Sequence, residues 1–183
     1  MTDYSAFAVG KNLAMTPGKV VFQNDLMQLI QYSPTTETVH EVPLLVMPAW
    51  INKYYILDLR PDNSFVKWAV DQGHTVFITS WVNPDSRHRD LDWDAFIDKG
   101  LMAAIETAQR ATGEKQVNVI GYCIGGTLLT TMLASLKAKG AASPVKSATF
   151  FTALIDFEDS GELTLFTDEA QISAMESMMH EKG

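Results

Sequence analysis

The stretch that decides the fold of this chain is Val-Asn-Val-Ile-Gly-Tyr-Cys-Ile-Gly-Gly, residues 117–126. Its β-branched start and the apolar helical pattern that follows predict a strand, a tight turn and a helix. Cys123 stands at the turn between Gly121 and Gly125. A nucleophile at such a turn has a strained backbone, and glycine neighbours avoid the collisions that side chains would cause. The pattern indicates a nucleophile elbow with sulfur in place of oxygen.

The turn also predicts groups that assist the sulfur. The backbone N–H of Ile124 points toward the nucleophile and is the first expected donor of an oxyanion hole, and the N-terminus of the following helix favours an anionic sulfur. The alternative is a buried, inert cysteine in an ordinary βα turn. Cys123 is the single cysteine of the chain, so no intramolecular disulfide is possible, and a working thiolate suits the reducing cytosol.

Length and composition predict one soluble domain. The chain has 183 residues, 46% of them hydrophobic, which suffices for a sizeable core. Its apolar runs are shorter than the roughly 18 residues that span a bilayer, and residues 1–19 have no signal-peptide pattern. The net charge of −8 is concentrated in residues 156–183, which hold eight acidic residues. An acidic tail repels phosphates, so nucleic-acid binding is not expected.

Strand and helix patterns alternate along the chain. Glycine, proline and hydrophobic periodicity predict strands at 43–48, 74–81, 117–120 and 147–154, and helices at 59–72, 94–112 and 125–139. Trp68 and Trp81 are expected in the core. Residues 19–32 predict a strand followed by a short helix, and 33–41 a polar linker. The long connections predict right-handed crossovers, hence a mostly parallel α/β sheet with helices on both faces and ligands at the carboxyl ends of its strands.

A second oxyanion donor is expected in the loop after the first core strand, as in α/β-hydrolase folds. This loop runs from Pro48 to Tyr55, and the position that matches the oxyanion turn is the N–H of Trp50. The alternative is a plain βα loop whose Trp and Tyr side chains cover the core.

A general base is harder to find. In α/β-hydrolase folds the histidine follows the nucleophile, and His180 alone does so, in a helical stretch at 168–180. It is more consistent with a solvated terminal histidine than with a base. His40, His74 and His88 precede the nucleophile and are expected in a linker, at the amino end of a strand and in a polar loop. No histidines have ligand spacing with a cysteine or carboxylate, so neither a metal nor another cofactor is predicted.

Several longer stretches carry a family resemblance: Pro-Ala-Trp-Ile-Asn-Lys-Tyr-Tyr-Ile-Leu-Asp-Leu (48–59), Gln-Gly-His-Thr-Val-Phe (72–77), Ser-Trp-Val-Asn-Pro (80–84) and the elbow. With them the chain resembles the class I polyhydroxyalkanoate synthases, from Thr16-Pro17 to Asp168-Glu169. The resemblance implies an α/β-hydrolase core and a Cys-His-Asp triad. It further implies (R)-3-hydroxyacyl-coenzyme A substrates, such as 3-hydroxybutyryl-coenzyme A, a growing polyester held as a thioester, a homodimer, and residence on cytoplasmic granules.

The resemblance also assigns residues and regions. Cys123 corresponds to the nucleophile, Ile124 and Trp50 to backbone donors, and Asn52 to a residue that lines the substrate site. The triad acid and base correspond to no residue of this chain. Members of the family are much longer, so the chain is expected to be a fragment. Residues 1–42 would end an N-terminal region and linker, 43–156 would form the first half of the core, incomplete at its C-terminus, and 157–183 would begin a cap.

Three functions remain open on the sequence. The first is an acyltransferase that polymerises (R)-3-hydroxyacyl thioesters, since exchange of one thioester for another keeps the acyl group activated. The second is a cysteine-dependent hydrolase of the same fold that acts on small esters or lactones. The third is a catalytically silent fragment. The stretch 48–59 favours the polymerase over the hydrolase, and the missing histidine is the feature that favours the silent fragment.

Overall fold

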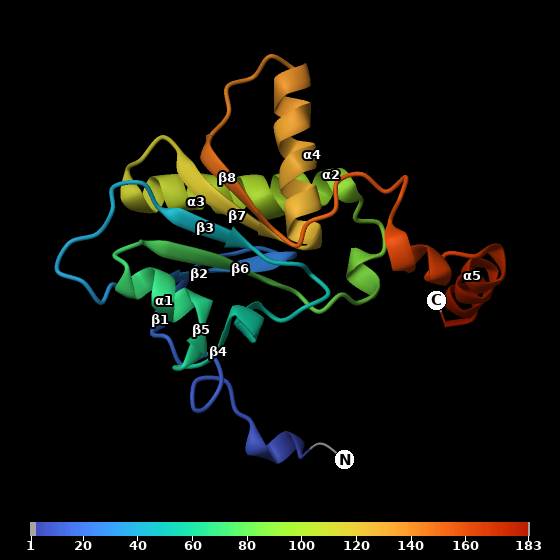
Figure 1. Ribbon diagram of the computed structural model, residues 1–183, viewed down its shortest axis with the longest axis horizontal. Coiled ribbons are helices and arrows are strands. Elements are labelled where there is room, and N and C mark those ends of the chain that lie inside the picture. The colour runs from blue at the N-terminus through green and yellow to red at the C-terminus, as the bar shows by residue number, and fades with distance from the viewer. Residues whose placement is uncertain (1–2, 183) are drawn as a thin grey trace. The chain divides into compact units, whose positions relative to one another are not determined.

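The computed structural model describes residues 3–182 in two compact units, which divide between Ala153 and Leu154. The first unit contains a six-stranded sheet in the order β1-β2-β6-β3-β7-β8 (Figure 1). Its strands are β1 (Gly18–Gln23), β2 (Met27–Tyr32), β3 (Leu44–Met47), β6 (Val76–Trp81), β7 (Val117–Tyr122) and β8 (Val145–Phe151). The last four are parallel to one another, which confirms the predicted mostly parallel sheet.

Residues 19–32 differ from the prediction of a strand and a short helix. They form most of an antiparallel hairpin, β1–β2, and β2 pairs antiparallel with β6. Asn24 makes the turn, because its side-chain oxygen accepts the backbone N–H groups of Leu26 and Met27, each at 2.9 Å. An Asx turn of this kind stops the chain from continuing as either strand or helix.

Helices cover both faces of the sheet, as predicted (Figure 1). Side chains of α3 and α4 pack with one face of the strands, and those of α1 pack with the other. The helices of this unit are η1 (Tyr4–Ala6), η2 (Tyr54–Leu57), α1 (Phe65–Asp71), η3 (Ser86–His88), α2 (Trp93–Ala95), η4 (Phe96–Met102), α3 (Ala103–Thr112) and α4 (Ile124–Ala138). β3, between the two layers, is buried along its whole length, as a central parallel strand should be.

The helix predicted at 59–72 is shorter than expected. Residues 58–64 instead form a small hairpin of β4 (Asp58–Arg60) and β5 (Asn63–Ser64), and the Ser64 hydroxyl caps α1 by accepting the Lys67 N–H at 2.9 Å. Gly73 follows α1 with φ of +83°, a left-handed conformation that ends the helix. Trp68 was predicted in the core, but it is 56% exposed because the buried face of α1 carries Val66, Ala69 and Val70.

The helix predicted at 94–112 is observed as a continuous run of α2, η4 and α3. Asp92 is its N-cap and accepts the Ala95 N–H at 2.9 Å, and Gly113 ends it with φ of +80°. The middle part, η4, has π-helical hydrogen bonding. Gly100 lies there against the Trp81 indole. A Cβ on Gly100 would lie 2.5 Å from the nearest indole carbon, so this helix approaches the sheet more closely than any side chain would allow.

The second unit, residues 154–183, contains η5 (Gly161–Phe166) and α5 (Glu169–Lys182), which confirms the helical pattern predicted at 168–180. His180 lies in α5 and is exposed. Among residues 3–182, no helix combines the length and apolar character needed to cross a membrane.

His74 gives the first unit an acid-sensitive group. Burial first, and the neighbouring His40 ring second, lower the pKa of His74 below 6.5, and the two ring centroids are 4.6 Å apart. Below pH 6.5 the unfolded chain therefore takes up a proton at His74 more readily than the folded chain does. The contribution of His74 to the free energy of unfolding is complete above pH 6.5 and is lost progressively below it. We expect thermal midpoints measured from pH 8 to 5 to fall less steeply for His74→Gln than for the parent. Equal slopes would contradict this role.

Candidate active site

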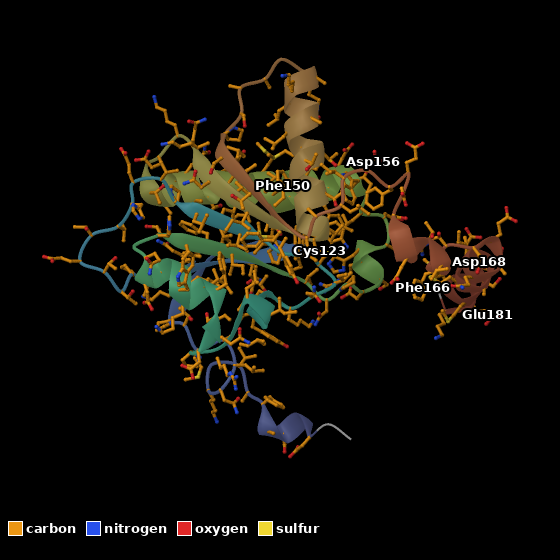
Figure 2. The ribbon with its side chains drawn as sticks, in the orientation of Figure 1. Cys123, Phe150, Asp156, Phe166, Asp168 and Glu181 are labelled. Atoms are coloured by element: carbon orange, nitrogen blue, oxygen red, sulfur yellow. The ribbon has the colours of Figure 1, made fainter. Side chains whose placement is uncertain are left out.

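Cys123 lies at a sharp turn between β7 and α4, at the carboxyl edge of the sheet (Figure 2). Its backbone has φ of 55° and ψ of −127°, a combination that a non-glycine residue adopts only under strain. The turn is held by the neighbouring strand, because the Cys123 N–H donates to the Phe151 carbonyl at 2.9 Å. The Cys123 carbonyl accepts the N–H of Gly126 at 2.8 Å and so starts α4. These bonds fix the backbone of the half-buried Cys123.

Three glycines make this turn possible. A Cβ on Gly121 would lie 2.5 Å from Gly126 Cα, and one on Gly125 would lie 2.2 Å from the Met47 carbonyl oxygen. The predicted need for Gly121 and Gly125 thus has a direct steric cause. Gly126 is a third such position that the sequence analysis missed, since its Cβ would lie 2.4 Å from that of Ala153. The signal was the glycine pair at 125–126, because two glycines at a helix start disfavour the helix unless packing requires them.

Two backbone donors are available near the elbow. Within residues 3–182, neither the Ile124 N–H nor the Trp50 N–H donates a hydrogen bond. Ile124 is the first residue of α4, where N–H groups have no partner inside the helix. Trp50 follows β3, and the chain just before it touches α4, because a Cβ on Gly125 would also lie 3.0 Å from the Pro48 carbonyl oxygen. The two loops that carry these donors are thus in contact.

Asn52, the predicted substrate-lining residue, is half-buried in the turn after Trp50, where its backbone N–H donates to the Ala49 carbonyl at 3.3 Å. The neighbouring Lys53 ammonium donates to the side-chain oxygen of Asn83. This bond joins the loop after β3 to the loop after β6 at the same sheet edge.

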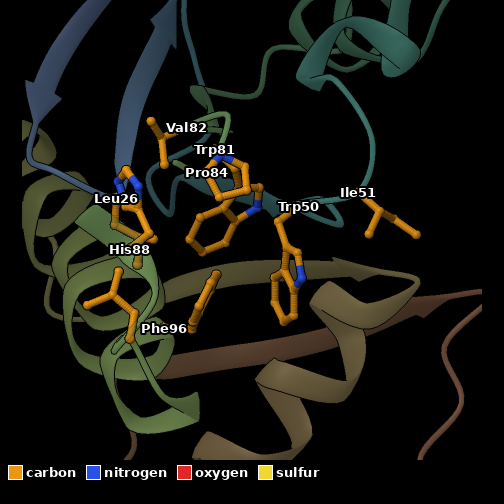
Figure 3. A pocket seen from close by; sticks show the side chains of 9 residues that line it. Leu26, Trp50, Ile51, Trp81, Val82, Pro84, His88 and Phe96 are labelled. Atoms are coloured by element: carbon orange, nitrogen blue, oxygen red, sulfur yellow. The ribbon is translucent and has the colours of Figure 1, made fainter. Parts of the chain in front are cut away.

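An apolar cavity of about 500 Å³ lies beside this edge (Figure 3). The Trp81 indole N–H donates to the Pro48 carbonyl at 2.8 Å and is buried, which confirms Trp81 as a core residue and fixes one wall of the cavity. No pattern in the sequence predicted this cavity. Its lining residues are Leu26, Trp50, Ile51, Trp81, Val82, Pro84, His88, Leu91 and Phe96.

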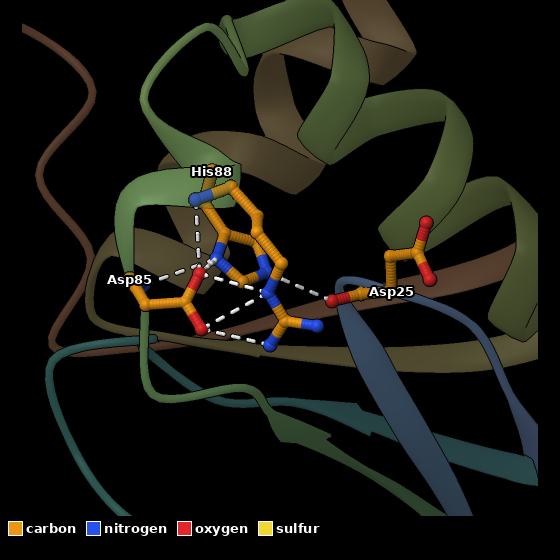
Figure 4. A network of polar contacts seen from close by, with 4 residues as sticks. Asp25, Asp85 and His88 are labelled. Carbon is orange, nitrogen blue, oxygen red and sulfur yellow. Dashed lines mark hydrogen bonds and ion pairs between the residues drawn. The ribbon is translucent and has the colours of Figure 1, made fainter.

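None of the three histidines in the first unit is bonded to Cys123. His74 precedes β6 and so lies at the amino edge of the sheet, as predicted. His40, in the predicted linker, donates from Nε2 to the Gln72 carbonyl at 3.1 Å and lies beside His74. His88 has both ring nitrogens occupied: Nδ1 accepts the Asp85 N–H at 3.1 Å and Nε2 donates to the Asp25 carbonyl at 3.0 Å (Figure 4). No triad forms in this unit among the residues that the structure describes.

No group of three or more His, Cys, Asp or Glu side chains in the described part of the chain is arranged to hold a metal ion.

The sheet order, the helices on both faces and the elbow define an α/β-hydrolase core. The alpha/beta hydrolase fold family matches residues 42–175, and the chain belongs to it. A second family, described as "Poly-beta-hydroxybutyrate polymerase (PhaC) N-terminus", matches residues 1–69. The resemblance to polyhydroxyalkanoate synthases is thereby confirmed.

Curated relatives extend this likeness over the whole chain. The chain is 55% identical over 182 residues to the poly(3-hydroxyalkanoate) polymerase subunit PhaC of Rhizobium etli, covering 100% of this chain and 28% of the relative. It is 55% identical over 182 residues to the poly(3-hydroxyalkanoate) polymerase of Methylorubrum extorquens, covering 100% and 30%. With the PhaC subunit of Cupriavidus necator it is 48% identical over 178 residues, covering 97% and 30%. The chain thus spans less than a third of the length of these relatives.

Solved structures support the fold alone. The chain aligns with one of the fungal esterases of Rhizomucor miehei at a TM-score of 0.55 and 13% identity, covering 91% of this chain and 52% of that one. It aligns with a sugar hydrolase of Lactococcus lactis at 0.51 and 13%, covering 77% and 55%.

Proposed function

We propose that this chain carries the nucleophile of a poly(3-hydroxyalkanoate) polymerase, with Cys123 as the residue that is acylated. The single observation that carries the proposal is the strained Cys123 backbone between Gly121 and Gly125, at a strand-to-helix turn of the kind that presents a nucleophile. The likeness to curated poly(3-hydroxyalkanoate) polymerases over the whole chain supports (R)-3-hydroxyacyl-coenzyme A as the proposed substrate class, with 3-hydroxybutyryl-coenzyme A as the representative substrate.

In the first step the Cys123 thiolate attacks the thioester carbonyl of the substrate. A carbon–sulfur bond to Cys123 forms, the bond to the coenzyme A sulfur breaks, and coenzyme A leaves as a thiolate that takes up a proton. Negative charge develops on the carbonyl oxygen in between, and the unbonded N–H groups of Ile124 and Trp50 are the proposed donors to it. Asn52, in the same turn as Trp50, is proposed to line the substrate site.

In the second step the 3-hydroxyl of another acyl unit attacks the acyl-cysteine. Its oxygen forms an ester bond, its proton goes to the general base, and the Cys123 sulfur is released. Both the substrate and the intermediate are thioesters, so the first step is nearly balanced and the acyl group remains reactive toward a hydroxyl. Exclusion of water in favour of that hydroxyl separates polymer formation from hydrolysis.

The proposed general base and its carboxylate partner lie in the part of the complete enzyme outside residues 3–153, because the histidines of that unit are bonded elsewhere or lie at the far edge of the sheet. By its likeness to the polymerases, the complete protein is also proposed to work as a homodimer at the surface of cytoplasmic polyester granules. Residues 157–183 are proposed to begin the cap, after a core section at 43–156 and an N-terminal section at 1–42.

Peptide mass spectrometry tests the nucleophile directly. The complete enzyme is mixed with (R)-3-hydroxybutyryl-coenzyme A, quenched with acid and digested with trypsin. We expect the peptide that contains Cys123 to gain the mass of one or more 3-hydroxybutyryl units, and hydroxylamine, which cleaves thioesters, to remove them. Acyl groups on another residue and none on Cys123 would contradict the proposal.

A further inference from the structure

The apolar cavity lies two strands away from Cys123 at the same edge of the sheet. β6, β3 and β7 are neighbours and run parallel, so their carboxyl ends lie together. The cavity starts where β6 ends, with Trp81 and Val82, whereas Cys123 follows β7. Adjacent strands are about 4.8 Å apart, so the carboxyl ends of β6 and β7 are separated by about 10 Å.

Trp50 connects the two places. It follows β3, the strand between β6 and β7, and its backbone carries one proposed oxyanion donor. Its side chain lines the cavity, where its ring centroid lies 4.5 Å from that of Phe96 and 5.8 Å from that of Trp81. Figure 3 shows the lining side chains arranged from Leu26 and His88 at one end to Trp50 and Ile51 at the other. Trp50 thus belongs both to the proposed oxyanion site and to the wall of the cavity.

The walls of the cavity are fixed before any ligand binds. The Trp81 ring is held by its bond to the Pro48 carbonyl on one side and by contact with Gly100 on the other. His88, with a side chain only 7% exposed, is held by Asp85 and Asp25 through both ring nitrogens (Figure 4). It therefore has no ring nitrogen left for a ligand and contributes a wall rather than a base. A preformed cavity binds a flexible chain with less ordering cost.

We propose that this cavity is an acyl-chain subsite, which holds the apolar part of the acyl group on Cys123 beyond its first few carbons. The inference rests on the proposed function, and it names the part of the substrate that the site selects. The cavity has the size of a small-molecule site, its lining is mostly aromatic and aliphatic, and within residues 3–182 no Lys, Arg, Asp or Glu lines it. The ends of β6 and β7 are about 10 Å apart, which places the Trp81 end of the cavity beyond the reacting carbonyl and within reach of a chain that extends from it.

Two different apolar chains have the chemistry to fill this cavity. One is the alkyl branch of one long monomer, and the other is the units of polyester already joined to Cys123. (R)-3-Hydroxyoctanoate represents the first source, and the linear trimer of (R)-3-hydroxybutyrate represents the second. Both probes are used as free acids for binding and as coenzyme A thioesters for acylation.

The binding test uses the complete enzyme with Cys123→Ala, so that no reaction occurs. Val82→Phe narrows the cavity, and Val39→Phe is the matched control, because Val39 is 46% exposed in the linker before β3. We expect tryptophan fluorescence to report saturable binding of one or both free acids. Val82→Phe is expected to weaken it about tenfold or more, and Val39→Phe to change it less than about twofold. If one free acid binds, it identifies the source of the chain, and if both bind, the cavity accepts an apolar chain from either source.

Acylation by the enzyme with Cys123 intact provides the second readout. We expect the rate of acylation by the longer thioester, relative to that by 3-hydroxybutyryl-coenzyme A, to fall about tenfold in Val82→Phe and to stay constant in Val39→Phe. No saturable binding in the Cys123→Ala protein, or equal binding and equal rate ratios in both valine variants, would overturn the subsite. Absence of Cys123 acylation by every thioester, with binding intact, would instead overturn the proposed function on which the subsite rests.

Discussion

Cys123→Ala in the complete enzyme is expected to abolish coenzyme A release from (R)-3-hydroxybutyryl-coenzyme A and to end polymer formation. Alanine has no atom that can hold the acyl group, and loss of a covalent nucleophile costs about 10⁶-fold in rate in comparable enzymes. Free thiol release measured over hours reports the loss. Ser135→Ala, farther along α4, is the control and should behave like the parent. Substantial polymer from Cys123→Ala would refute the nucleophile assignment.

Cys123→Ser distinguishes the chemistry of the atom from the shape of the site. The hydroxyl fits the same turn, so folding should be unaffected and the thermal midpoint should match that of the parent. The rate is expected to fall at least about 10²-fold, because a hydroxyl depends far more than a thiol on a general base. A serine ester is also a poorer acyl donor than a thioester, so any acyl-enzyme that forms should accumulate without polymer. A serine variant with parental turnover would show that sulfur has no special role.

The parts of the fold that local pattern determines were predictable from the sequence. β3 was visible as a short continuous apolar run bounded by prolines, because a strand buried on both faces has no polar alternation. The elbow was visible because a strand, a glycine-flanked cysteine and a helix follow one another within ten residues. Local sterics determine that turn, and local sterics can be read from the sequence.

Other elements depend on contacts between distant segments, and these were missed. The strand predicted at the start of 19–32 is β1, but the short helix predicted after it is the strand β2, whose pairing with β1 and β6 became evident only in the structure. The helix predicted to begin at residue 59 begins only at Phe65, because the residues before it are held by the buried side chain of Asp58. Its carboxylate accepts hydrogen bonds from the hydroxyls of Ser64 and, 42 residues earlier, Thr16, each at 2.6 Å. Those bonds hold residues 58–64 as a hairpin where Pro61 would otherwise suit a first helical turn.

The candidate site also has one part that could be predicted from the sequence and one part that could not. Cys123, Ile124 and Gly125 belong to one local motif, so their arrangement could be predicted, and Trp50 could be placed because it follows the adjacent strand. The cavity could not, because its walls come from three separate parts of the chain: the β2 turn, the loop after β3, and residues 81–96. The aromatic lining residues Trp50, Trp81 and Phe96 have the sequence pattern of ordinary core residues. Only the assembled sheet edge shows that they line a cavity.

The second large effect is expected from Gly125→Val, which tests the geometry of the elbow without changing its chemistry. Gly125 is helical, a conformation that permits any side chain, so intrinsic helix propensity alone predicts no large loss. Its Cβ would lie 2.2 Å from the carbonyl oxygen of Met47, and this oxygen belongs to the backbone of a central strand that cannot move aside freely. We expect a loss of about 3 kcal/mol in the free energy of unfolding, measured by urea titration.

Activity should fall further than stability in this variant. Any shift that relieves the contact moves the first turn of α4 away from β3, and this separates the Ile124 N–H from the Trp50 N–H. Loss of one oxyanion donor costs about 10²-fold to 10³-fold in rate, which adds to the loss of folded protein. Gly113→Ala is the matched control: its Cβ would meet nothing within 4 Å, and the cost arises from its φ of +80° alone. It should lower stability by about 1 kcal/mol and leave the rate per folded molecule unchanged. Parental stability and rate in Gly125→Val would show that β3 and α4 are not in the contact that defines the elbow.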